Sequence, residues 1–171
     1  SLYFIQLAQK CFENEIAKQV IMLGRYSKHL IKKSLENHQD LVNEDFTYLF
    51  RLMDYPSLTK MQLIEKNAHE KQSGIEIIKR LVRNGLFVES PDKDDKRSTR
   101  ISVTEKGKKV FQESMKDITV VSKIMCGRLN DSEKENLLKS LKKLNTFHHT
   151  IYTNLRDEEP GELLKMVENA G

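Results

Sequence analysis

LTKMQLIEKNAHEKQSGIEIIKRLVRNGLFVESPDKDDKRSTRISVTEKG spans residues 58–107 and carries the clearest structural signals in this chain. Thr59 and Gln62 have the spacing of a capping box, in which each side chain binds the other residue's backbone amide at a helix start. Apolar residues at helical spacing predict a short helix there, and a second helix after Asn67-Ala68. Asn84-Gly85 ends the second helix, because glycine tolerates the left-handed backbone just past a helix end.

Two segments after this helix have the composition of strands. They are Leu86-Phe87-Val88 and Arg100-Ile101-Ser102-Val103, and the charged loop Pro91–Arg97 lies between them. The order helix, turn, helix, strand, charged loop, strand is that of a winged helix-turn-helix. The sequence therefore predicts a mainly α-helical fold with a small β-hairpin wing.

Helices are also predicted before this centre. Apolar residues recur at helical spacing from about Glu13 to Glu36. Asn43 is a suitable N-cap for a further helix. Tyr55-Pro56 breaks that helix, because proline disfavours helical backbone in the residue before it.

Two more helices are predicted after the wing. Thr104 can cap the first, and Ser132–Glu135 has the form of a second capping box. The last helix carries a seam that suits packing against another helix. Its members alternate steps of four and three: Leu137, Leu141, Leu144, His148, Ile151 and Leu155.

One continuous structural unit with three parts follows from this order. Residues 1–42 form an N-terminal dimerisation helix, residues 43–107 a winged helix-turn-helix lobe, and residues 108–171 the C-terminal dimerisation helices. Flanking helices with apolar seams left over are expected to find a second copy of the chain, which makes a homodimer.

Composition limits the classes of function. A chain of 171 residues with 38% hydrophobic content suits one globular domain. No apolar run approaches the roughly 18 residues that a membrane span needs, and Leu2–Ile5 lacks the flanks of a signal peptide. Cys11 and Cys126 lie far apart without a CxxC motif, so a disulfide scaffold is not indicated and a reducing cytoplasm is expected.

The net charge of +4 is unevenly distributed. Between residues 57 and 107 there are 11 Lys/Arg against 8 Asp/Glu, a surplus of 3, whereas residues 156–171 hold 2 against 5. A mildly basic centre permits a polyanionic partner without requiring one.

Side chains in the centre suit the reading of double-stranded DNA. Glutamine pairs with adenine, lysine with guanine and serine with either. The second helix supplies this set: Gln72, Ser73 and Lys79. A thin basic loop suits a narrow minor groove, and its cations are Lys96, Arg97 and Arg100. The helix start at Thr59 offers amides to a phosphate.

Other interpretations stay open at this level. Lys71, Lys79 and Arg80 could merely solvate a helix face, since a charge run is usually surface. A winged helix can also serve protein contacts without touching DNA.

Catalytic chemistry is not indicated, because no phosphate-binding glycine loop and no nucleophile elbow occur. His148 and His149 point about 100° apart on a helix and are unsuited to hold one ion. We therefore expect no enzyme, no cofactor and no metal, although a zinc site assembled in three dimensions stays open.

The central residues resemble the multiple antibiotic resistance regulator (MarR) family of bacterial transcription regulators. The likeness covers residues 58–107 closely and the flanks only in layout. It is carried by Leu58-Thr59, Gln62-Leu63, Leu81, Gly85-Leu86, Asp95-Lys96-Arg97, Val103-Thr104 and Gly107. The resemblance implies a homodimeric, ligand-responsive repressor that binds a near-palindromic operator in double-stranded DNA.

The resemblance also implies roles for single residues. The helix from Glu70 to Arg83 enters the major groove, and its DNA-contacting positions are Lys71, Gln72, Ser73, Ile75, Glu76 and Lys79. Arg97 takes the wing-tip position that reaches the minor groove, and Asp95 takes the acidic position that holds this arginine.

Two features of this comparison concern packing and ligands. Gly74 stands where the family usually has an apolar packing residue, and a mid-helix glycine costs roughly 0.5–1 kcal/mol relative to alanine. A small aromatic or anionic effector is implied between the helical platform and the lobes. Four residues are candidates to line its pocket, with core packing as the alternative: Tyr26, His29, Phe46 and Phe50.

Overall fold

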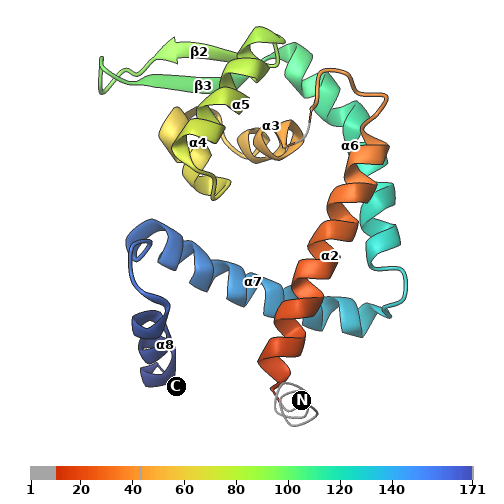
Figure 1. Cartoon of the computed structure of the whole chain (residues 1–171). Helices are drawn as coiled ribbons and strands as arrows, with labels where there is room; N and C mark the ends of the chain where they lie inside the picture. The colour runs from red at the N-terminus through yellow and green to blue at the C-terminus, as the bar shows by residue number, and fades with distance from the viewer. Residues whose placement is uncertain (1–10, 43, 171) are drawn as a thin grey trace.

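The computed structural model describes residues 11–42 and 44–170, and Figure 1 shows the arrangement of their helices and strands. The elements in chain order are α2 (Phe12–Ser34), α3 (Asp45–Met53), β1 (Leu58–Thr59), α4 (Lys60–Lys66), α5 (Lys71–Arg83), β2 (Phe87–Pro91), β3 (Thr99–Val103), α6 (Glu105–Met125), α7 (Asp131–Asn154) and α8 (Pro160–Asn169). The expected class, mainly helical with a small hairpin wing, is confirmed.

The strands form one antiparallel sheet in the order β1-β3-β2. Leu58 pairs with Ile101, and Phe87 pairs with Val103. The hairpin of β2 and β3 projects from the lobe as the wing (Figure 1). β2 runs as far as Pro91 because it is an edge strand, where the missing amide of proline removes no ladder bond.

One hydrophobic core joins α3, α4, α5 and the sheet. Its fully buried apolar side chains are Tyr48, Leu49, Leu52, Leu63, Leu81, Leu86 and Ile101. Outside this lobe, α2 packs along α6, and α7 passes beneath them towards the lobe (Figure 1). Neither α2 nor α7 buries a residue. The core therefore lies in the lobe that carries the helix-turn-helix.

Two of the predicted helix starts are not confirmed. Asn43, the expected N-cap of α3, lies outside the described residues. The capping box of α7 is formed by Asn130 and Glu133, and the prediction that it begins at Ser132 is wrong. The backbone amide of Glu133 donates to Asn130 Oδ1 over 2.9 Å, and the backbone amide of Asn130 donates to Glu133 Oε2 over 2.8 Å.

Helix α8 was missed by the sequence analysis. It begins at Pro160, and proline at the first helical position was the available signal. Within the described ranges, none of the helices combines the length and the apolar content needed to cross a membrane.

Candidate nucleic-acid interface

Local hydrogen bonds build the helix-turn-helix. The backbone amide of Gln62 donates to Thr59 Oγ1 over 3.2 Å, and the backbone amide of Thr59 donates to Gln62 Oε1 over 2.9 Å. The predicted capping box is therefore present, and it occupies two of the amides that the sequence offered to a phosphate. In the turn that follows, Ala68 has φ of +51°, a left-handed conformation that is unfavourable for a residue with a Cβ.

Gly74 allows α5 to lie against α4 and α3. A Cβ at this position would stand 2.5 Å from Ile64 Cγ1 and 2.8 Å from Tyr48 Oη. Both neighbours are buried, so neither can move aside freely. The glycine is thus required by close packing, which explains why an apolar packing residue is absent here.

A buried ion pair ties α5 to α3. Asp45 is fully buried, and its Oδ2 accepts from Arg80 Nε over 2.9 Å. Arg80 Nη2 donates to Oδ1 over 2.5 Å, which makes the pair bidentate. These hydrogen bonds raise the pKa of Arg80. Arg80 therefore fixes the direction of α5 and does more than solvate its face, a role that no local pattern in the sequence indicates.

The outer face of α5 carries the side chains predicted to read DNA. Those exposed to solvent are Lys71, Gln72, Ser73, Glu76 and Lys79. Gln72 Nε2 donates to Glu76 Oε1 over 3.2 Å, so these two side chains are coupled. Ile75 differs from the rest because it is half-buried and packs against the core.

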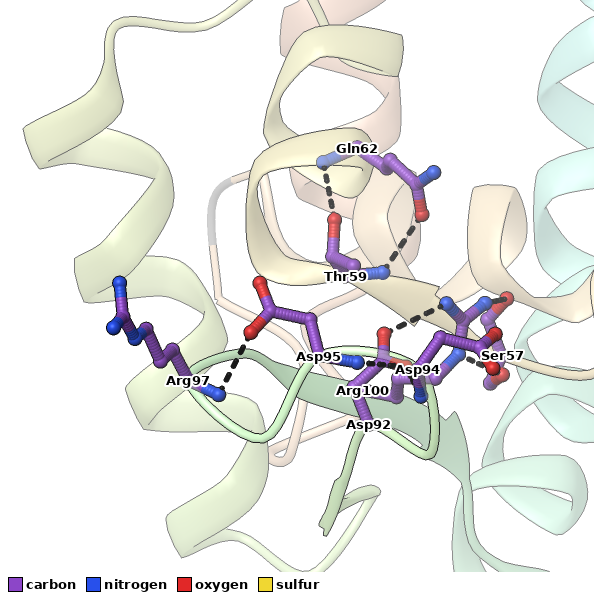
Figure 2. A network of polar contacts seen from close by, with 8 residues as sticks. All are labelled: Ser57, Thr59, Gln62, Asp92, Asp94, Asp95, Arg97 and Arg100. Carbon is purple, nitrogen blue, oxygen red and sulfur yellow. Dashed lines mark hydrogen bonds and ion pairs between the residues drawn. The ribbon is translucent and has the colours of Figure 1, made fainter.

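The wing tip is shaped by aspartates, as Figure 2 shows. Asp95 Oδ1 accepts from the backbone amide of Arg97 over 2.9 Å, while the Arg97 guanidinium points away from it (Figure 2). Asp92 accepts from the amides of Asp94 and Asp95, and these bonds, first that of Asp94, help to lower the pKa of Asp92. Asp95 therefore holds the backbone of the wing, which leaves the Arg97 side chain exposed.

Arg100 is engaged at the base of the wing. Its Nε donates to Ser57 Oγ over 2.7 Å and its Nη2 to the Ser57 carbonyl oxygen over 2.9 Å. Its Nη1 lies 3.3 Å from Asp92 Oδ2 (Figure 2). Arg100 is thus paired at the base of the wing, whereas Lys96 and Arg97 are exposed at the tip.

The four candidate pocket residues do not come together. The Phe46 and Phe50 rings meet edge-on at 5.7 Å, and Phe50 packs on Phe111 at 4.9 Å. A cavity of about 290 Å³ lies between α2 and the start of α3, with Phe46 in its wall. Tyr26 and His29 are exposed on α2 and do not line this cavity.

Two polar residues of the lobe were missed at the sequence level. They are Tyr48 of α3 and His69 in the turn before α5, and Tyr48 Oη lies 3.0 Å from His69 Nδ1. Burial raises the pKa of Tyr48 to about 12, so its hydroxyl stays protonated at neutral pH and can pair with either tautomer of the imidazole. No local pattern reveals this pair, because 21 residues separate its members.

The described part of the chain holds neither a cluster of metal-binding side chains nor a pair of bonded cysteines. No group of three or more His, Cys, Asp or Glu side chains there could hold an ion. Cys11 and Cys126 are free, partly buried thiols.

Comparisons with known proteins agree with this geometry. Residues 53–107 match the winged helix DNA-binding domain family model. The chain is 25% identical over 126 residues to the HTH-type transcriptional repressor NicR of Pseudomonas putida, an alignment that covers 68% of this chain and 80% of NicR.

Solved structures extend the likeness to the helical flanks. A MarR transcriptional regulator from Methanosarcina mazei has a TM-score of 0.73 and 26% identity, covering 80% of this chain and 97% of that one. A mutant MarR from E. coli, solved in complex with operator DNA, shares the fold with a TM-score of 0.69 and 19% identity, covering 79% of this chain and 99% of that one. The lobe and the wing form a winged helix DNA-binding domain, and together with the flanking helices they give this chain a fold shared with transcriptional regulators of the MarR family, to which it is similar.

Proposed function

We propose that this protein binds a near-palindromic operator in double-stranded DNA as a homodimer and represses transcription. The observation that carries the proposal is the pairing of an exposed polar face on α5 with an exposed basic tip on the wing. Lys96 and Arg97 at this tip form no ion pair with any described residue, which leaves both cations available to phosphates or to a minor groove.

The reading helix has the groups that base recognition requires. Gln72, Ser73 and Lys79 present donors and acceptors to solvent on α5. Lys71 precedes them at the helix start, where backbone amides and the helix dipole favour a phosphate. Ile75 and Glu76 complete the proposed face, with Ile75 positioned for an apolar contact to a thymine methyl group.

Thr59 and Arg100 have different proposed roles. The Thr59 hydroxyl accepts from an amide but keeps a hydrogen to donate to a phosphate. Arg100 supports the wing from below through Ser57 and Asp92, together with Asp95 at the tip, so its contribution to DNA affinity is indirect.

Exposed apolar side chains on the helical platform support the homodimer. Phe12 is 83% exposed in the single chain. Further exposed apolar side chains on α2 and α7 are Ile16, Val20, Ile21, Leu23, Leu137, Leu138, Leu141, Leu144 and Phe147. Apolar surface of this extent marks an interaction site, and a second copy places two lobes about 34–36 Å apart on successive major grooves.

Repression and regulation by a ligand are the finer parts of the proposal. Repression by this protein is supported by its similarity to NicR, which is described as a transcriptional repressor. The cavity beside Phe46 is a place for a small effector between platform and lobe. The site of action is the cytoplasm, where an operator in a bacterial chromosome lies. An effector acts only if it favours one lobe spacing over another.

Selection from randomised duplex DNA at two salt concentrations tests the proposal. We expect a near-palindromic motif whose affinity falls steeply with salt. Arg97→Ala should weaken binding, with Arg128→Ala as the control, since Arg128 is an exposed cation between α6 and α7. Light scattering should report a dimer.

Failure has two distinct forms. If no motif is enriched even at low salt, DNA binding is wrong and the alternative, a winged-helix protein-interaction module, takes its place. If a motif is enriched but the protein is a monomer, only the paired-lobe model is wrong.

A further inference from the structure

Two residues at the end of α7 contact the segment just before the reading helix α5. They are Tyr152, in the last turn of α7, and Arg156, two residues beyond its end. Tyr152 donates its hydroxyl hydrogen to the carbonyl oxygen of His69, and Arg156 pairs with the carboxylate of Glu70. His69 and Glu70 immediately precede α5, and Glu70 is its N-cap residue. The platform and the reading helix are therefore in direct contact at this point.

This contact continues into the core of the lobe. The Arg156 guanidinium lies over the Tyr152 ring, 4.7 Å from its centroid, and braces that ring beside the turn. His69 in turn lies 3.0 Å from the hydroxyl of the fully buried Tyr48. A continuous set of hydrogen bonds thus runs from the Tyr152 side chain to the His69 backbone, and from the His69 side chain to Tyr48.

The start of α5 needs such external support. Glu70 occupies the N-cap position, but its side chain makes no capping hydrogen bond, so it does not fix the first turn. The preceding turn holds Ala68 in the left-handed region at φ of +51°. The Tyr152 and Arg156 contacts fall on the two residues between this strained position and the first proposed DNA contact, Lys71.

We propose that Tyr152 and Arg156 are positioning residues that hold the start of α5 in the orientation that reads DNA. The platform helix α7 thereby transmits its own position to the reading helix through His69 and Glu70. This inference rests on the proposed DNA-binding function and assigns neither residue a contact with DNA.

Tyr152→Phe is the sharpest test, because it removes one hydroxyl and changes no charge. We expect its affinity for the selected operator to fall about two- to tenfold, the effect of one hydrogen bond. The slope of log affinity against log salt should not change, since no phosphate contact is lost. Tyr55→Phe is the matched control, because the Tyr55 hydroxyl bonds to no described residue.

Arg156→Ala separates positioning from a direct phosphate contact. As a positioning residue it should also weaken binding at an unchanged salt slope. A slope reduced by about one would make Arg156 a phosphate contact and overturn its proposed role. In the double variant the two losses should be less than additive, because both side chains brace the same turn.

Hydrogen exchange of the free protein gives a readout without DNA. Tyr152→Phe should speed exchange of the Gly74 amide, which donates to the Glu70 carbonyl oxygen, and leave α6 unchanged. Operator affinity and exchange both equal to wild type would overturn the inference. If the wild type selects no DNA, the proposed function fails by itself, and the exchange result then decides whether α7 orders the start of α5.

Discussion

Replacing Gly74 by alanine should destabilise the protein, against the usual effect of this substitution. Alanine in the middle of a helix is ordinarily better than glycine by roughly 0.5–1 kcal/mol, because the unfolded glycine has more freedom to lose. Gly74 lies within α5 and is buried, so only its surroundings can reverse that gain.

The magnitude follows from what the new methyl group meets. It would lie 2.5 Å from Ile64 Cγ1, 2.8 Å from Tyr48 Oη and 2.9 Å from Ile64 Cδ1. Relieving such overpacking in a close-packed core costs typically about 1–3 kcal/mol. After the helical gain is subtracted, we expect a net loss of about 0.5–2 kcal/mol in the free energy of unfolding, with α5 displaced from α4.

Urea denaturation at one fixed protein concentration measures this loss, since the stability of a dimer depends on concentration. Gly24→Ala is the control. Gly24 lies within α2, and an added Cβ there would meet nothing within 4 Å in the single chain, so this variant should gain roughly 0.5–1 kcal/mol. A Gly74→Ala protein as stable as wild type, or more stable, would refute the packing argument.

Two further predictions concern the polar groups buried in the lobe. Arg80→Met should lower the free energy of unfolding by about 3–5 kcal/mol, because it removes the guanidinium from the fully buried Asp45. The control, Lys79→Met on the exposed face of α5, should change this free energy by less than about 0.5 kcal/mol in the same urea denaturation. Equal effects of the two substitutions would contradict the role of the Arg80–Asp45 pair. The raised pKa of Tyr48, about 12 against its ordinary value of 10, means that the unfolded chain releases a proton above pH 10 that the folded protein keeps. The free energy of unfolding should therefore fall by roughly 2–3 kcal/mol in total from pH 10 to pH 12. In Tyr48→Phe, the free energy of unfolding should fall less steeply over this pH range. An equal dependence on pH in the two proteins would exclude Tyr48 as its source.

Much of the lobe could be predicted because its signals are local. The Thr59–Gln62 capping box, the Thr104 cap that accepts from the Gly107 amide, and Gly85 at φ of +76° all join residues a few positions apart or depend on one residue's own backbone. Local signals did not suffice to place the capping box of α7. Asn130 and Ser132 are both good caps, and sequence spacing alone did not decide between them.

The candidate interface was predicted less completely, because several of its residues have roles set by distant partners. Arg100 looks equivalent to Arg97 in the sequence. Its position on β3, however, brings it to Ser57, 43 residues away, and commits its guanidinium to the base of the wing. Arg97 at the loop tip meets no such partner among the described residues, and its guanidinium stays exposed.

The amino-acid sequence by itself determined the order of the elements between residues 58 and 107, including the wing, because these follow from hydrogen bonds and apolar periodicity within about four residues along the chain. Tertiary structure alone decided that Gly74 is a packing requirement, that Arg80 neutralises a buried Asp45, and that α7 contacts the start of α5. Each of these depends on two segments far apart in the chain being brought within a few ångströms. Such proximity results from packing the core, and no local pattern records it.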